Sequence, residues 1–184
     1  YEYKVSASGR VNIIGEHVDY CGGKVFPAAL SLKNTVYVKP NGTDKINLSW
    51  TTLDDKVSLD INKLEEYESL KYGNYQAGCA LVWKNAGHKL VGCDMLQDCK
   101  VPFGSGLSSS SAIEVSTLVA LATISGEKID GIHAPWAQEL AEKYTFTMQN
   151  ADEILKREVG EIFKKILENC GVFKLTPSGT EAFS

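Results

Sequence analysis

The feature that most restricts this chain is a glycine- and serine-rich run that passes directly into an apolar helix pattern. Residues 101–112 read Val-Pro-Phe-Gly-Ser-Gly-Leu-Ser-Ser-Ser-Ser-Ala, and 113–124 follow as a helix-like stretch ended by Ser125-Gly126. Gly104 and Gly106 allow positive φ and close backbone approach to a ligand. The helix that begins near Ser108 would aim its amides and positive dipole at the same place. We therefore predict a polyphosphate cradle, in which one serine hydroxyl can bind Mg²⁺.

The composition of this run separates it from two better-known phosphate motifs. It lacks the Gly-Lys-Ser/Thr ending of a P-loop, and no acidic residue follows at the distance that a dinucleotide-binding fold requires. A Gly/Ser-rich linker or an ordinary helix N-cap remains an alternative, although a linker is not expected immediately before an apolar helix.

A second unusual stretch lies near the N-terminus, where residues 9–20 read Gly-Arg-Val-Asn-Ile-Ile-Gly-Glu-His-Val-Asp-Tyr. Closely spaced carboxylates with a histidine suit the hydroxyl groups of a sugar, each of which donates and accepts. Arg10 could stabilise phosphoryl charge. A solvated surface turn remains an alternative, whereas one histidine and two acids packed this closely rarely form a metal cage.

The pattern along the chain mixes strands and helices without strict alternation, which favours the α+β class. Strand-like segments fill the first sixty residues, and helical periodicity begins at Asn74 and ends before Gly87. The strands within the first sixty residues are predicted near 4–7, 24–30, 35–39, 46–50 and 56–59, and another strand near 91–100. Two more helices are predicted near 135–146 and 152–168.

Length and charge exclude several classes. The 184 residues suffice for one domain with a core, and a net charge of −4 without a basic stripe argues against nucleic acid as a partner. No stretch is long enough to span a membrane and no signal peptide is visible. The five cysteines are scattered without a C-x-x-C pair, so free thiols and a cytoplasmic location are expected. The absence of an initiator Met suggests a trimmed start or a fragment.

Together the two stretches resemble the galactokinases of the GHMP kinase superfamily, which also contains homoserine, mevalonate and phosphomevalonate kinases. Residues 9–20 resemble the galactokinase signature G-R-x-N-L-I-G-E-H-x-D-Y with Ile13 as a conservative change, and residues 101–112 resemble the superfamily's ATP motif. The likeness covers roughly residues 3–143. It implies a GHMP kinase N-terminal domain, an α+β fold with a mixed sheet packed with helices and related to ribosomal protein S5 domain 2.

The resemblance implies ATP-dependent phosphorylation of D-galactose at O1, with ATP and Mg²⁺ as cofactors, galactose and ATP as small-molecule partners, and a monomeric parent protein. N-acetylgalactosamine or arabinose is not distinguished from galactose. Arg10 would lie beside the transferring phosphoryl group. The implied galactose-binding residues are Glu16, His17, Asp19 and Tyr20.

The same resemblance assigns the nucleotide site. Ser110 would bind Mg²⁺, with Glu142 as the second metal ligand, although a solvated helix face explains Glu142 equally well. Tyr72, in a Tyr72-Gly-Asn-Tyr75 element, would stack near adenine. The implied phosphate-binding residues are Gly104, Ser105, Gly106, Leu107, Ser108 and Ser109.

The likeness stops after Tyr144, so we divide the chain into a galactokinase-like unit, residues 1–144, and a non-matching, mostly helical tail, residues 145–184. The family continues into a C-G-I-M-D-Q element whose Asp is the proposed base. Here only Asp152 lies near that place, and it reads first as a helix N-cap. An incomplete kinase with little activity is therefore expected. A non-catalytic sensor of galactose and ATP is the alternative.

Overall fold

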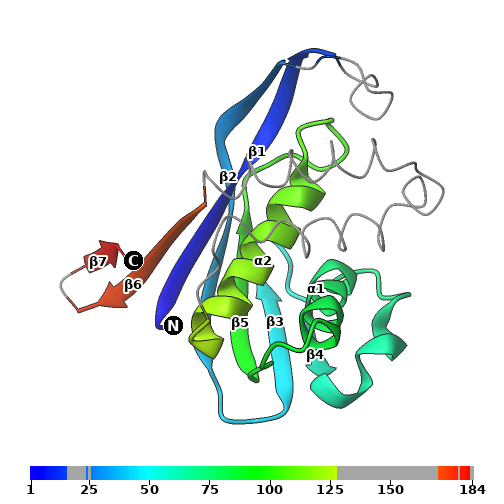
Figure 1. Cartoon of the computed structure of the whole chain (residues 1–184), viewed down its shortest axis with the longest axis vertical. Helices are drawn as coiled ribbons and strands as arrows, with labels where there is room; N and C mark the ends of the chain where they lie inside the picture. Colours follow the sequence, from blue (N-terminus) through cyan, green and yellow to red (C-terminus); the bar gives the residue numbers. More distant parts are fainter. Residues whose placement is uncertain (16–23, 25, 128–169, 178, 183–184) are drawn as a thin grey trace.

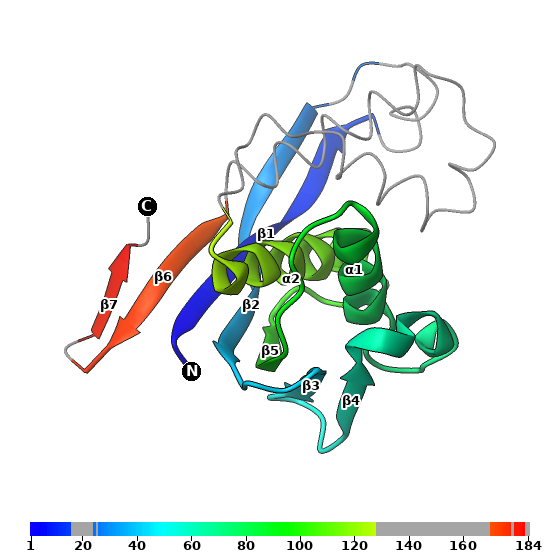
Figure 2. The same ribbon diagram turned by 60° about the horizontal axis from the view of Figure 1, so that its bottom comes forward.

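The described residues form a mixed seven-stranded sheet in the order β4-β3-β5-β2-β1-β6-β7, with α1 and α2 on the same face (Figures 1 and 2). The computed structural model describes residues 1–15, 24, 26–127, 170–177 and 179–182. Its elements are β1 (Tyr3–Ile14), β2 (Phe26–Pro40), β3 (Lys45–Trp50), β4 (Lys56–Asp60), the 3₁₀ helix η2 (Ile61–Tyr67), α1 (Asn74–Asn85), β5 (Cys93–Cys99), α2 (Ser109–Ser125), β6 (Gly171–Thr176) and β7 (Gly179–Ala182). The α+β class and the mixed sheet predicted from the sequence are confirmed.

The long β1–β2 hairpin forms the centre of the sheet. Tyr3 pairs with Val38 at one end and Ile14 with Phe26 at the other, with register shifts after Ser8 and after Asn12. The two short strands predicted at 24–30 and 35–39 are one continuous strand, because no glycine or proline interrupts the chain between them. The first half of the galactokinase-like signature is thus strand, and the solvated-turn alternative is wrong for its first six residues.

The core lies between the sheet and α2, which crosses β1 and β2 (Figure 2). Twelve of the seventeen residues of α2 are buried, which matches its almost continuous apolar sequence. Val5, Val36 and Val38 face it from the sheet and are fully buried. The burial of α2 fixes the position of its N-terminus, where the glycine–serine run ends.

One polar group is also buried in this core. Asn34 of β2 donates hydrogen bonds to Gln97 Oε1 (2.9 Å) and to Ser116 Oγ (2.7 Å) on α2. Because buried polar groups are costly without partners, these bonds favour one register of α2 on the sheet.

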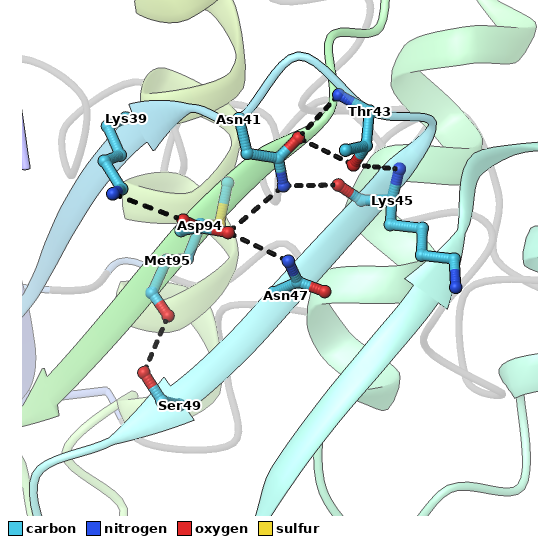
Figure 3. A network of polar contacts seen from close by, with 8 residues as sticks. All are labelled: Lys39, Asn41, Thr43, Lys45, Asn47, Ser49, Asp94 and Met95. Atoms are coloured by element: carbon cyan, nitrogen blue, oxygen red, sulfur yellow. Dashed lines mark hydrogen bonds and ion pairs between the residues drawn. The ribbon is translucent and has the colours of Figure 1, made fainter.

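Asp94 organises a polar network at β2, β3 and β5 (Figure 3). Its Oδ1 accepts hydrogen bonds from Asn47 Nδ2 (2.9 Å) and Asn41 Nδ2 (3.1 Å), and its Oδ2 lies 3.5 Å from Lys39 Nζ. The oxygen of the Asn41 amide in turn accepts from the amide and the hydroxyl of Thr43. The network therefore ties β5 to β3 and to the turn that precedes β3.

The end of the described chain joins the same sheet. β6 pairs antiparallel with β1, and β7 with β6. The turn expected at 176–180 is present, with Thr176 Oγ1 donating to Gly179 O at 3.1 Å, but the strands on either side of it were not predicted. The division at residue 144 and the helices at 135–146 and 152–168 stay predictions, since residues 128–169 lie outside the described part.

Candidate sugar and phosphate site

The glycine–serine run forms a loop that is pinned at both ends to the central hairpin. At its start, Lys100 N donates to Lys33 O of β2 (2.9 Å), and the Val101 side chain is buried. At its end, Arg10 N of β1 donates to Leu107 O (3.0 Å). The loop is therefore held against the strand that carries the first half of the signature.

Gly9 makes this close approach possible. A Cβ atom at Gly9 would lie 2.8 Å from Leu107 O and 3.0 Å from Val101 Cγ1. Contacts this short are essentially absent between real side chains and backbone, so a larger residue would push the loop away from β1.

The Arg10 side chain connects β1 to the N-terminus of α2. Its Nε donates to Ser108 Oγ (3.2 Å) and its Nη1 donates to Asn12 Oδ1. A guanidinium group has five N–H donors, so in the described part of the chain these two bonds leave three without a partner. Asn12 is 7% exposed, and its buried Nδ2 has no partner among the described residues, so a second unsatisfied donor lies beside Arg10.

α2 begins at Ser109, in agreement with the start expected near Ser108, so part of the serine run forms its first turn. Ser108 is the N-cap residue, with φ 59°, and its hydroxyl makes no capping bond. The first helical bond is Ala112 N to Ser108 O (3.0 Å). The amides of residues 109–111 donate no hydrogen bond to the described part of the chain.

The open amides lie in a favourable field for an anion. The first turn of α2 carries no acidic side chain. One turn further, burial raises the pKa of Glu114 to about 8, so this carboxyl group is mostly protonated at neutral pH. Among the described residues, the N-terminus of α2 therefore presents free donors and a positive dipole without an acidic side chain in its first turn.

The loop glycines leave space where a ligand would approach. A Cβ atom at Gly104 or Gly106 would meet nothing within 4 Å, and both residues have positive φ. Ser105 Oγ donates to Pro102 O (2.7 Å), a bond within the loop. The shape and the free amides fit a phosphate site better than a flexible linker.

Two tyrosines of the predicted adenine element lie in different surroundings. The Tyr72 ring packs against Trp50 (6.1 Å between centroids), with Lys71 Nζ 5.0 Å from its centroid. Tyr75 instead hydrogen-bonds to Ser110 Oγ (3.0 Å) and lines a recess of about 540 Å³ beside α1. The sequence reasoning did not select Tyr75 or Asn12 as site residues, although both belong to the quoted motifs.

The structure thus brings Arg10 together with the phosphate loop. The role of Tyr72 near adenine stays a prediction. No group of three or more His, Cys, Asp or Glu that could hold a metal occurs among the described residues, and none of their helices is long and apolar enough to cross a membrane. The predicted residues that lie outside the described part are Glu16, His17, Asp19, Tyr20, Glu142 and Asp152.

Comparison with protein families gives two matches. Residues 2–40 match the galactokinase galactose-binding signature, and residues 74–151 match the N-terminal domain of the GHMP kinases. A galactokinase from Clostridium tetani is 37% identical over 125 residues, which is 67% of this chain and 32% of that protein. A galactokinase from Lactococcus lactis is 28% identical over 170 residues, 90% of this chain and 43% of the relative.

Solved structures agree on the fold. Methanococcus jannaschii mevalonate kinase superposes with a TM-score of 0.73 and 16% identity, covering 100% of this chain and 56% of that one. Lactococcus lactis galactokinase, solved with galactose, superposes with a TM-score of 0.72 and 24% identity, and the match covers 98% of this chain and 46% of that one. The chain spans between 28% and 43% of the length of the curated relatives that it matches.

Proposed function

Because this chain belongs to the galactokinase family of the GHMP kinases, we propose that it binds D-galactose and Mg²⁺–ATP for transfer of the γ-phosphoryl group to the sugar O1. The product would be galactose 1-phosphate. The observation that carries the proposal is the direct contact of the signature strand with the phosphate loop, through Arg10 N to Leu107 O and Arg10 Nε to Ser108 Oγ. A phosphoryl donor and a sugar acceptor must meet at such a junction.

The described residues supply positioning and charge for this reaction. The open amides of residues 109–111 would bind phosphate oxygens at the N-terminus of α2. Arg10, held by Asn12 and Ser108, would direct its remaining donors to the transferring phosphoryl group, where negative charge is spread over the oxygens. Glu16, His17, Asp19 and Tyr20 would bind the galactose hydroxyls.

The described residues also fit a magnesium ion that is held mainly by the nucleotide. Mg²⁺ prefers oxygen ligands and usually takes one or two from the protein, with phosphate and water completing the shell. Ser110 offers a hydroxyl on the first turn of α2, and Glu142 would be the second protein ligand. When bound, the ion would neutralise charge on the phosphates; a cage of three or more acids is not needed.

Calorimetric titration of the purified chain tests the two binding sites separately. Gly106→Val should abolish ATP–Mg²⁺ binding while galactose still binds, because the new side chain fills the loop's open space and meets no protein atom there. Gly87→Val is the matched control, since Gly87 also has positive φ and open space but follows α1. Loss of both ligands in Gly106→Val alone would show that Gly106 supports the fold rather than the nucleotide.

The choice of sugar is tested by competition between galactose, glucose and N-acetylgalactosamine. Asp19→Ala should weaken galactose binding by about 1.5–3 kcal/mol, the typical contribution of a charged hydrogen bond. Equal binding of glucose and galactose would contradict the proposal.

A second candidate function is non-catalytic binding of galactose and ATP, favoured by the departure of residues 145–153 from the family's C-G-I-M-D-Q element. Formation of galactose 1-phosphate under saturating substrates separates the two. We expect little turnover from this chain. Turnover at an ordinary kinase rate that is lost in Asp152→Asn would instead identify Asp152 as the base.

The organisation around the site is also proposed. The galactokinase-like unit would occupy residues 1–144, in a monomeric, cytoplasmic protein. The four cysteines in the described part of the chain, Cys79, Cys93, Cys99 and Cys170, are free thiols, which agrees with a reducing environment.

A further inference from the structure

Two side-chain contacts join α1 to α2 directly beneath the phosphate loop. Ser110 Oγ donates to Tyr75 Oη (3.0 Å), and Cys79 Sγ donates to Glu114 O (3.7 Å). Tyr75 and Cys79 are four residues apart on α1, as are Ser110 and Glu114 on α2, so the two contacts lie one helical turn apart on the facing sides of the helices. The seam between the helices therefore fixes the Tyr75 hydroxyl relative to Ser110.

The start of α1 is equally well defined. Its N-cap is Gly73, whose carbonyl accepts from Ala77 N (2.9 Å), and the consecutive residues Gln76 and Ala77 are buried. Tyr75 itself is 37% exposed and borders the recess beside α1. Its hydroxyl thus lies between that recess and the loop.

The hydroxyls of the loop are used in different ways. Ser105 Oγ donates to the loop's own Pro102 O, and Ser108 Oγ accepts from Arg10. Ser110 Oγ is bonded to a side chain of another helix. Of these three serines, Ser110 is therefore the one whose hydroxyl is oriented by a residue of α1.

We propose that Tyr75 is a positioning residue for the metal of the phosphate site. Its hydroxyl accepts the hydrogen bond of the Ser110 hydroxyl, so that the lone pairs of Ser110 Oγ face the cation. This inference rests on the proposed function, because it assumes that Ser110 binds Mg²⁺. A hydroxyl has one proton and two lone pairs, and a cation at the lone pairs repels the proton. The proton then needs an acceptor on the far side, which the Tyr75 oxygen provides at 3.0 Å.

Partners of this kind orient metal ligands, and their loss typically lowers metal affinity about 10–100-fold. Tyr75→Phe removes the acceptor and keeps the ring. It should therefore lower the factor by which Mg²⁺ strengthens ATP binding, and leave metal-free ATP binding and thermal unfolding unchanged. A residue that only supports the fold would affect ATP binding with and without the metal.

The experiment is a calorimetric titration of ATP into the full chain, in Mg²⁺ and in EDTA, for wild type, Tyr75→Phe and Tyr37→Phe. Tyr37→Phe is the matched control, since this tyrosine lies on β2 with its ring against Tyr1 (6.2 Å between centroids) and has no part in the phosphate site. We expect the Mg²⁺ enhancement to fall about tenfold or more in Tyr75→Phe alone.

Three results would overturn the proposal: an unchanged Mg²⁺ enhancement in Tyr75→Phe, an equal loss of ATP affinity with and without metal, or an equal effect of Tyr37→Phe. A wild-type chain that binds no ATP under either condition would instead overturn the proposed function, and this inference with it. The two failures are therefore distinguishable from the wild-type titrations.

Discussion

Arg10 Nε donates a hydrogen bond of 3.2 Å to the hydroxyl of Ser108, a residue 98 positions away that begins α2. A serine at this position normally accepts a bond from an amide of its own helix. Here the hydroxyl turns to β1 instead, and the backbone adopts the left-handed region at φ 59°. The bond thus joins the predicted phosphoryl-binding arginine to the phosphate loop and leaves the helix amides open.

The coupling of these two residues is measurable. Arg10→Met and Ser108→Ala, combined in a double-mutant cycle, should give a non-additive change in the free energy of ATP–Mg²⁺ binding of about 0.5–3 kcal/mol. The control cycle pairs Arg10→Met with Ser111→Ala, which has no described bond to Arg10 and should be additive. Additivity in both cycles would mean that the contact carries no energy.

Gly9→Ala should displace the loop from β1, because its Cβ would lie 2.8 Å from Leu107 O. Forced contacts of this kind cost about 1–3 kcal/mol. We expect urea unfolding to show a loss in this range together with weaker ATP binding. Gly104→Ala, which meets no atom within 4 Å but has positive φ, measures backbone strain alone, whereas Gly9 has no positive φ and its variant measures the collision alone. Unchanged stability and unchanged ATP binding in Gly9→Ala would contradict the close-approach explanation.

The buried carboxyl group of Glu114 predicts a stability that declines with pH. Burial raises its pKa in the folded protein from 4.5 to about 8. Between these values the unfolded chain is ionised and the folded one holds the proton, so the free energy of unfolding falls as pH rises, by at most about 1.4 kcal/mol per pH unit. Above pH 8 the effect levels off.

Glu114→Gln should therefore flatten the pH dependence of thermal unfolding between about pH 5 and 8, and be more stable than wild type at the upper end of this range. Exposed Glu65→Gln is the control. If the pH dependence of thermal unfolding persists in Glu114→Gln, groups other than Glu114 cause it.

Asp94 predicts the opposite dependence. Hydrogen bonds from Asn47 and Asn41 and the nearby Lys39 lower the pKa of Asp94 in the folded state. The stability that the ionised Asp94 contributes is therefore fully present above its unfolded pKa of 3.8, and it is lost as pH falls through its lower folded pKa.

Asp94→Asn should lower the free energy of unfolding at pH 7 by about 1–2 kcal/mol. A neutral amide oxygen accepts the bonds from Asn41 and Asn47 more weakly than a carboxylate does, and the amide nitrogen replaces the oxygen that faces Lys39 Nζ. Thermal unfolding should show that this difference narrows in acid, where Asp94 becomes protonated. Exposed Asp55→Asn is the control. A gap that is constant with pH would exclude the charge as its cause.

The local part of the site was predictable from the sequence, because glycines with positive φ and a serine run before an apolar segment restrict the backbone directly. The start of α2 near Ser108 was predicted from the glycine–serine run, although serines have low helix propensity and the apolar pattern begins only at Ile113. Contacts across the chain, such as Tyr75 with Ser110, could not be predicted, because sequence periodicity does not say which helix faces which.

The sheet shows the same division. The alternating and β-branched segments gave the positions of β3, β4 and β5 closely. The continuous β2 was read as two strands, and β6 was missed because the tail carried no recognised motif. β6 forms by hydrogen bonding to the edge of β1, which is distant in the sequence, so a short window of sequence around β6 carries no sign of this pairing.

That pairing has a consequence for synthesis on the ribosome. β1 leaves the ribosome well before β6, which fills one of its two edges, with Leu175 N donating to Glu2 O at 2.8 Å. Until Thr176 has left the exit tunnel, this edge of β1 has no partner from β6. Unpaired strand edges readily join other strands. A newly made chain therefore carries an open strand edge while the segment between β1 and β6 is synthesised, and a nascent-chain chaperone would find exposed backbone there.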